Sequence, residues 1–425
     1  MSTVQTASPR RDSTSPWRVG LLLLLLSACA PTSTRWEPDG AIPGGPPGEP
    51  NPFVHQEGAR LVDGSGAPLR LTGVNLGGWL LWEGWIWGGG WQSEKDMLDK
   101  LRQLVGNEEA ARFVQRVHEG YIGEEDIAEI ARLGFNSVRV PFNHTLLEDD
   151  VAPFVYKPSG WTVLDRLLDW CEAHGVYVVL DLHAAPGGQA PFYMADPDST
   201  SLWDSRSNRD RTVALWRAIA ERYREHPALA GYDLLNEPRP PRGQDLFDLY
   251  RRIAAAIREV DPHHLIIVEG GEGGTDFSLF THPVTYNQAY SFHMYTWFGD
   301  PRREEIARYA AISREHGIPM WNGEFGENSL EMISSTAAMY TEPGSGLSGF
   351  SFWTWKKVPN NTPHLVGITA PMPAWKKLVS WLANGWNARP SVAEARQGMD
   401  EFLEAAQLSN CELNPDMATG LGGRP

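Results

Sequence analysis

A polar pair at the end of an apolar run is the feature of this sequence best suited to chemistry. Residues 231–238 read Gly-Tyr-Asp-Leu-Leu-Asn-Glu-Pro. The apolar residues predict a short buried strand, which cannot continue through Pro238 and therefore ends at Asn236 and Glu237. An amide and a carboxylate at that point would lie on the rim of a sheet or barrel. A turn cap is the alternative interpretation, because Asn and Pro are both common in turns.

Apolar runs of this kind alternate with amphipathic helical patterns along most of the chain. Strands separated by helices form parallel sheets, because parallel neighbours need long connections. We therefore predict an α/β fold, a single (β/α)8 TIM barrel, with an N-terminal hairpin at 60–70 and long βα loops after Trp82 and at 187–207. The predicted strands occupy residues 71–76, 135–141, 176–183, 229–237, 265–268, 289–295, 319–325 and 349–355.

The polar residues on these runs share one position, at or near the carboxyl end. In a barrel those ends converge on one face, where active sites are found. Packing alone does not explain such a set, since each side chain would leave a buried polar group to satisfy. Three members have structural alternatives: Arg139 as a simple ion-pair partner, His183 as a buried strand cap and Trp353 as core. The expected site comprises Asn75, Arg139, His183, Asn236, Glu237, His293, Tyr295, Glu324 and Trp353.

Two glutamates of this set would face each other across the barrel mouth, Glu237 after the fourth run and Glu324 in the seventh. Opposed carboxyl groups suit the hydrolysis of a glycosidic bond, because one protonates the leaving oxygen while the other attacks the anomeric carbon. A separation of about 5 to 5.5 Å favours retention of configuration, and one of about 6.5 to 9.5 Å favours inversion. This chemistry needs no metal and no organic cofactor, and we expect neither. The sequence has no Cys/His pattern typical of zinc sites.

In order and spacing, five motifs resemble those of glycoside hydrolase family 5, whose members are (β/α)8 retaining glycosidases. The resemblance covers roughly residues 60–382, and residues 73–80 look like the branch of exo-β-1,3-glucanases and their relatives. The motifs are Arg139-Val140-Pro141, Leu180-Asp181-Leu182-His183, Leu235-Asn236-Glu237-Pro238, His293-Met294-Tyr295 and Gly323-Glu324-Phe325.

The resemblance implies a role for each residue of the expected site. Glu237 would be the general acid/base and Glu324 the nucleophile. Tyr295 would hold the orientation of Glu324, and Arg139 would keep Glu324 ionised by its charge. The remaining roles are sugar contacts and support: Asn236 at the 2-hydroxyl, His183 at other hydroxyls, Trp353 as the floor of the subsite at the cleavage point, His293 beside Glu237, and Asn75 as a further supporting residue.

Composition narrows the substrate class. The 425 residues carry a net charge of −16 and include 18 Trp. This balance argues against nucleic acid or acidic polysaccharide and favours a neutral ligand that stacks on aromatic rings. We predict a retaining hydrolase of a neutral β-linked oligo- or polysaccharide, a β-1,4- or β-1,3-glucan, that acts as a monomer. The alternatives are a β-mannanase, a glycosidase acting on glycolipid, and a non-catalytic sugar-binding protein of the cell surface.

The first 29 residues resemble a bacterial lipoprotein signal peptide. Arginines at positions 10, 11 and 18 precede an apolar run at 19–26, and Leu26-Ser27-Ala28-Cys29 follows the pattern of a lipidation site. The run is too short to span a bilayer, which needs about 20 apolar residues. We expect Cys29 to be lipidated and to anchor the protein in the cell envelope, at the outer membrane or cell surface. The alternative is an ordinary signal peptide and secretion.

These patterns divide the chain into four parts. They are the signal peptide (1–29), a Pro/Gly-rich linker (30–53), the barrel domain (54–408) and a flexible C-terminal tail (409–425). Cys171 lies in a helical pattern and Cys411 in the tail; we expect two free thiols, and one bridge is the alternative.

Four further carboxylates lie near strand ends. Any of them could bind sugar, but we interpret most of them as charges on loops. They are Glu83, Glu269, Glu272 and Glu327.

Overall fold

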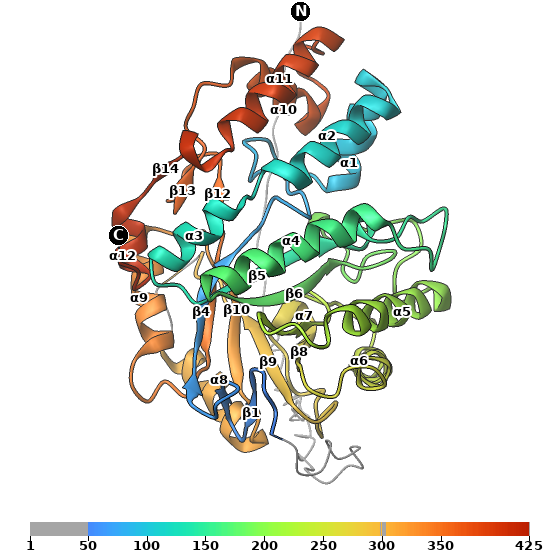
Figure 1. Ribbon diagram of the computed structural model, residues 1–425. Helices are drawn as coiled ribbons and strands as arrows, with labels where there is room; N and C mark the ends of the chain where they lie inside the picture. Colours follow the sequence, from blue (N-terminus) through green and yellow to red (C-terminus); the bar gives the residue numbers. More distant parts are fainter. Residues whose placement is uncertain (1–49, 298, 300–302, 425) are drawn as a thin grey trace, which may run out of the picture. The chain divides into compact units, whose positions relative to one another are not determined.

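The predicted barrel is present. The computed structural model describes residues 50–424 apart from 298 and 300–302, and among these residues eight parallel strands close in the order β10-β11-β4-β5-β6-β7-β8-β9 (Figure 1). Each strand matches one of the apolar runs. The strands are β4 (Leu71–Asn75), β5 (Ser137–Asn143), β6 (Tyr177–Ala184), β7 (Leu229–Asp233), β8 (Leu265–Glu269), β9 (Gln288–His293), β10 (Met320–Gly326) and β11 (Gly349–Trp353). The predicted signal peptide, including Cys29, and most of the linker lie outside the described residues.

Helices connect the strands, as a parallel sheet requires. The sequence pattern predicts one helix over 94–117, but Gly106, with a φ of 89° that glycine adopts easily, divides it into α1 and α2. None of the helices in the described part of the chain is long and apolar enough to cross a membrane.

The bounds of the helices follow in chain order. They are α1 (Glu94–Val105), α2 (Asn107–Gly120), α3 (Glu124–Arg132), α4 (Pro158–His174), α5 (Arg206–Tyr223), α6 (Gly243–Arg258), α7 (Gly271–Gly274), α8 (Arg303–His316), α9 (Leu330–Thr341), α10 (Pro373–Asn384), α11 (Val392–Ala405) and α12 (Pro415–Gly420), with short 3-10 turns at η1 (His144–Leu146), η2 (Tyr193–Ala195) and η3 (Leu408–Asn410).

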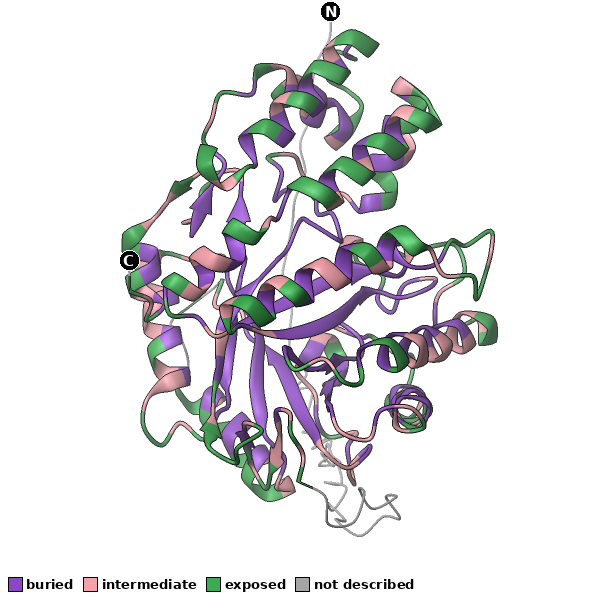
Figure 2. Cartoon of the chain, viewed as in Figure 1, coloured by how far each residue is buried: buried purple, intermediate pink, exposed green. Residues whose placement is uncertain are grey.

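The strands of the barrel are buried along their lengths (Figure 2). Their inward residues form an apolar layer toward the amino ends of the strands and a polar layer toward the carboxyl ends. Val179, Ala230 and Ile267 belong to one buried apolar cluster. Three acidic residues follow them on the same strands and are fully buried. Asp181 and Glu269 lie two residues after Val179 and Ile267, and Asp233 lies three residues after Ala230. The polar layer therefore lies nearer the carboxyl ends of the strands, where the sequence predicts the site.

A small N-terminal sheet closes the other end of the barrel. It contains β1 (His55–Glu57), β2 (Arg60–Val62) and β3 (Pro68–Leu69), and β2 pairs antiparallel with β3 as the hairpin prediction required. Leu61 of this sheet belongs to the same buried cluster as Val179 and Ile267. The hairpin thus covers the apolar layer from below.

The C-terminal segment is folded, and the prediction of a flexible tail is wrong. Strand β14 (Glu412–Leu413) pairs with β13 (Val366–Gly367), which pairs with β12 (Lys356–Lys357). Helix α12 packs on α9, and its Met417 is fully buried. Polar residues at 409–416 hide this pattern in the sequence, because only a few apolar side chains carry the contact. Cys171 and Cys411 are both free, as expected.

Candidate active site

A cleft of about 490 Å³ lies at the carboxyl ends of the barrel strands. It is lined by most of the expected site residues, namely His183, Asn236, Glu237, Tyr295, Glu324 and Trp353. The other expected residues are buried behind the lining: Arg139 bonds to Glu324, His293 bonds to Glu237, and Asn75 bonds to Arg139. The structure therefore brings the whole predicted set together.

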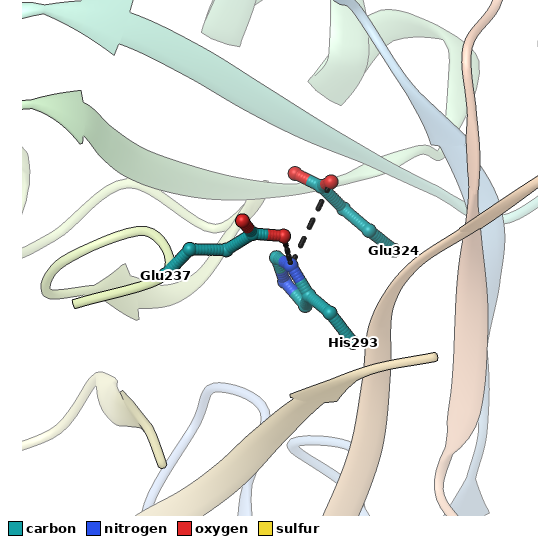
Figure 3. Close-up of side chains that lie close together, drawn as sticks. All are labelled: Glu237, His293 and Glu324. Atoms are coloured by element: carbon teal, nitrogen blue, oxygen red, sulfur yellow. Dashed lines mark hydrogen bonds and ion pairs between the residues drawn. The ribbon is translucent and has the colours of Figure 1, made fainter. Parts of the chain in front are cut away.

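The two glutamates approach each other in this cleft (Figure 3). Glu237 follows β7 and Glu324 lies on β10; an oxygen of each and a nitrogen of His293 all lie within 4.8 Å of one another. His293 Nδ1 is 2.8 Å from Glu237 Oε1 and 3.6 Å from Glu324 Oε2. This approach fits the shorter of the two carboxyl separations, about 5 to 5.5 Å, far better than the longer one.

Glu324 is held through both of its oxygens. Arg139 Nη1 donates to Oε1 at 2.6 Å, and the Tyr295 hydroxyl donates to Oε2 at 2.9 Å. Hydrogen bonds from a cation are shorter and stronger than those between neutral groups. The carboxylate is therefore fixed in one orientation at the floor of the cleft.

Arg139 is the centre of the buried polar layer. Its guanidinium bonds Asp233 at 2.9 Å and Glu269 at 3.0 Å, and lies 3.1 Å from Asp181. Burial raises the pKa of Asp181 to about 8 and that of Asp233 well above its usual range. Because one guanidinium faces more carboxylates than it can balance, part of this cluster keeps its protons at neutral pH.

Asn75 and Asn236 complete the contacts of Arg139. The amide oxygen of each accepts from the guanidinium, at 3.1 Å for Asn75 and 2.9 Å for Asn236. Asn75 Nδ2 donates to the carbonyls of Gly323 and Ser351, so this side chain acts wholly inside the barrel. The NH2 group of Asn236, in contrast, remains available to a molecule in the cleft.

Glu237 and His293 form a hydrogen-bonded pair. Burial alone would raise the pKa of Glu237, but the hydrogen bond and charge of His293 outweigh it and lower that pKa. Burial also favours a neutral ring for His293, yet the carboxylates of Glu269 and Glu324 raise its pKa well above the usual value. The pair therefore holds one proton in common, on the imidazole side of the bond.

His183 and Trp353 form one wall of the cleft. Their rings stack with centroids 5.4 Å apart and planes within 13°. His183 Nδ1 lies 2.6 Å from Asp181 Oδ2, and burial lowers the pKa of His183 to about 4, so the ring is neutral. With Nδ1 donating to Asp181, Nε2 is left as an acceptor for a ligand hydroxyl.

Aromatic residues from the long loops extend the cleft. Glu83 Oε2 accepts from Trp85 Nε1 at 2.7 Å and from the Tyr193 hydroxyl at 3.0 Å, and Trp91 packs against both rings. Trp91 is 63% exposed, so its ring face is available to a ligand. The predicted functional loops after Trp82 and at 187–207 thus both contribute to the lining.

A second aromatic group lies on another part of the cleft wall. Trp297 stacks on Tyr295 with centroids 4.8 Å apart, and its Nε1 donates to Glu327 at 3.1 Å. Burial raises the pKa of Glu327 to about 7.

The interpretation of the spare carboxylates as loop charges is correct for Glu272 and wrong for the other three. Glu272 is exposed and pairs with Arg239. Glu83 and Glu327 line the cleft, and Glu269 is fully buried against Arg139. One signal in the sequence marks Glu269: it ends its apolar run in the same position as the other site residues.

Within the described part of the chain, two groups of side chains have the composition of a metal site. They are Asp181, Asp233 and Glu269, and Glu237, His293 and Glu324. In the first group the guanidinium of Arg139 already contacts all three carboxylates and supplies the positive charge. In the second group His293 lies between the carboxylates.

The pH dependence of stability offers a test of this electrostatic environment. Burial raises the pKa of Glu83 from 4.5 to about 8. Between those values the folded protein binds the proton and the unfolded chain releases it, so Glu83 lowers the free energy of unfolding as pH rises from about 4.5 to about 8. Glu83→Gln keeps an acceptor for Trp85 and Tyr193 but has no such proton. Its stability relative to wild type should therefore rise across that window, measured by urea unfolding at several pH values.

Exposed Glu225, whose side chain is 84% exposed, supplies the control substitution. A stability difference between Glu83→Gln and wild type that is constant with pH, like that of Glu225→Gln, would contradict the buried environment assigned to Glu83.

Comparison with known proteins agrees with this geometry. A protein named beta-xylosidase from Phanerodontia chrysosporium is 36% identical over 293 residues, which are 64% of this chain and 61% of that protein. A glucan 1,3-beta-glucosidase from Blumeria graminis is 35% identical over 176 residues, 40% of this chain and 41% of that protein. The chain thus spans less than two thirds of the length of either relative.

The fold recurs in a solved structure, a rutinosidase from Aspergillus niger. It is 17% identical with a TM-score of 0.58, and the match covers 69% of this chain and 91% of that one. At the level of sequence, the model of the family described as cellulase (glycosyl hydrolase family 5) matches residues 102–358, more than half of the 425 residues. This chain belongs to glycosyl hydrolase family 5.

Proposed function

We propose that this protein is a β-glycoside hydrolase that retains anomeric configuration, with Glu324 as nucleophile and Glu237 as general acid/base. The observation that carries the proposal is the approach of the two carboxylates within one cleft, with oxygens within 4.8 Å. Their surroundings differ as the two roles require, since Arg139 and Tyr295 hold Glu324 whereas His293 supplies a proton to Glu237.

The first step forms a covalent intermediate. Glu324 attacks the anomeric carbon, the bond from that carbon to the leaving oxygen breaks, and Glu237 gives the leaving oxygen the proton that it shares with His293. In the second step Glu237 takes a proton from water, whose oxygen attacks the anomeric carbon and releases Glu324. The two inversions give net retention, and the pair of Glu237 and His293 ends with the proton it began with.

Residues around the pair would bind the sugar. The NH2 group of Asn236 is suited to donate to the 2-hydroxyl, because Arg139 occupies its oxygen. Nε2 of His183 can accept from a neighbouring hydroxyl, and the indole of Trp353 offers a flat surface at the cleavage point. Asn75 acts by supporting Arg139 rather than by touching substrate.

Substitution of the two glutamates tests the roles separately. Glu324→Gln should reduce turnover on all substrates, by about 10²-fold or more, because the attacking carboxylate is lost. Glu237→Gln should lose activity mainly on substrates with poor leaving groups, since a nitrophenolate leaves without a proton, and azide should restore its turnover by attacking the intermediate without a general base. The measurements are steady-state kinetics on an aryl glycoside and an unactivated glycoside of the same sugar. NMR identifies which anomer of the product is released first.

Each role has an outcome that excludes it. Near-normal turnover by Glu324→Gln would remove Glu324 from the nucleophile role, and initial release of the inverted anomer would exclude a covalent intermediate. Glu225→Gln serves as the matched surface control.

For the substrate, we propose a neutral β-linked glucan, joined β-1,4 or β-1,3. The net charge of −16 disfavours an anionic sugar, whereas Trp91 and Trp297 offer exposed faces for neutral rings. The family description names cellulase, and one relative is named for glucan 1,3-β-linkages. A β-xyloside is a second candidate, because the relative that is 36% identical is named beta-xylosidase.

A product profile distinguishes these substrates. We expect linkage-defined gluco-oligosaccharides to be cleaved faster than the matching xylo- and manno-oligosaccharides and than glucosylceramide, compared as kcat/KM with products identified by chromatography. Faster cleavage of the xylo-series would favour the second candidate. Binding to the panel without turnover of any member would instead favour a sugar-binding protein.

We also propose that the protein is exported and anchored to the cell envelope through lipid on Cys29. The support is the sequence around Leu26-Ser27-Ala28-Cys29. In a bacterial host, radiolabelled palmitate should enter the wild-type protein and not Cys29→Ala, which should leave the membrane fraction. Equal labelling of the two proteins, or none in either, would contradict lipidation at Cys29.

A further inference from the structure

Glu269 contacts both halves of the catalytic arrangement without lining the cleft. It is the last residue of β8 and is fully buried. Its Oε2 accepts from the backbone N–H of Glu237 at 2.7 Å, and its Oε1 accepts from Arg139 at 3.0 Å. The same Oε1 lies 3.0 Å from Nε2 of His293. One carboxylate thus reaches the backbone of Glu237, the ring bonded to its side chain, and the guanidinium bonded to Glu324.

The backbone contact holds an uncommon conformation. Glu237 has a φ of 43°, in the left-handed region that residues other than glycine rarely adopt. Such conformations persist only where surrounding contacts impose them. The bond from Glu237 N–H to Glu269 is such a contact, and it directs the side chain of Glu237 toward the cleft and His293.

The ring contact decides where His293 can carry a proton. A carboxylate beside Nε2 favours a hydrogen on that nitrogen, which leaves Nδ1 to exchange a proton with Glu237. Without Glu269, the ring could place its hydrogen on Nδ1 and leave Nε2 bare. Passing the Nδ1 hydrogen to Glu237 would then leave an imidazolate anion, so the ring could not serve as the proton donor of Glu237.

We propose that Glu269 is a positioning residue that fixes the backbone of Glu237 and makes His293 its proton partner. The inference rests on the proposed hydrolysis, in which Glu237 is the acid/base. Glu269 does not touch the substrate; it acts through Glu237 and His293. Nothing in the family match or in the relatives' names assigns this role.

The charge around His293 sets the expected effect. The groups that face it are Glu237 from the loop after β7, Glu269 from β8, Glu324 from β10 and Asp181 from β6. Arg139 from β5 bonds to the carboxylate of Glu269. Glu269 is the foremost of the carboxylates that raise the pKa of His293. Removing the charge of Glu269 lowers the proton affinity of the Glu237–His293 pair. The pair then loses its proton at lower pH, so the alkaline limb of activity moves to lower pH.

The test compares Glu269→Gln with wild type and with Glu272→Gln, which removes one negative charge from the exposed part of the same loop. In Glu269→Gln the alkaline limb of kcat/KM should move down by about 1 to 3 pH units. The loss of kcat should be larger on an unactivated disaccharide than on a dinitrophenyl glycoside, whose leaving group needs no proton. Glu269→Asp, which restores the charge, should bring the limb back toward the wild-type position. Glu272→Gln should match wild type in both measurements.

Two outcomes would overturn the inference while leaving the proposed function intact. One is a pH profile of Glu269→Gln that coincides with wild type; the other is an equal loss on both leaving groups, as expected of a purely structural residue. Wild-type protein that hydrolyses neither substrate would instead contradict the proposed function itself.

A measurement on the wild-type protein guards against variants that do not fold. In 15N-histidine NMR, with His293 assigned by the signal missing from His293→Gln, both ring nitrogens should be protonated at neutral pH. An unprotonated Nε2 would contradict the role of Glu269 whatever the variants do.

Discussion

A guanidinium enclosed by carboxylates is the constraint on which this active site depends. Arg139 is fully buried, and transferring its charge out of water is costly unless partners surround it. Asp181, Asp233 and Glu269 provide those partners, and Glu324 receives one of the remaining N–H groups. The position of the proposed nucleophile is thus tied to the electrostatic balance of the barrel interior. Moving it would break the 2.6 Å ion pair with Arg139 and the hydrogen bond from Tyr295.

The two layers of the barrel make this arrangement stable. The lower layer is apolar and is covered by the N-terminal hairpin through Leu61. Water therefore has little access to the polar cluster from below, and electrostatic interactions are stronger in such surroundings than in solvent. Solvent therefore reaches Glu237 and Glu324 through the cleft at the carboxyl ends of the strands. Arg139, His293 and Glu324 lie on barrel strands, while Trp85, Trp91 and Tyr193 of the cleft are carried on loops.

The sequence was informative wherever local pattern and function coincide. Alternating apolar runs predicted every strand of the barrel, and polar residues at the run ends predicted Glu237 and Glu324. Glu269 is among the four further carboxylates that the sequence shows near strand ends, but its role is hidden there, because its partners come from distant parts of the chain and a carboxylate after an apolar run resembles a loop charge. The folded tail was missed for a related reason. Met417 is buried by contact with a helix far away in sequence, and tertiary packing of this kind leaves no periodic signal.

The aromatic residues on the two long loops can change independently of the charged residues on the strands, which affects how a protein of this kind can diversify. Glu83 bonds to Trp85 and Tyr193, and Trp91 packs on both of their rings. Among the described residues, none of these three aromatic side chains has a hydrogen bond to Arg139 or His293. Insertions or exchanges in those two connections can therefore reshape the cleft while Glu237, His293 and Glu324 keep their contacts. Proteins descended from one such scaffold can in this way differ in what the cleft accepts while they inherit the same buried polar layer.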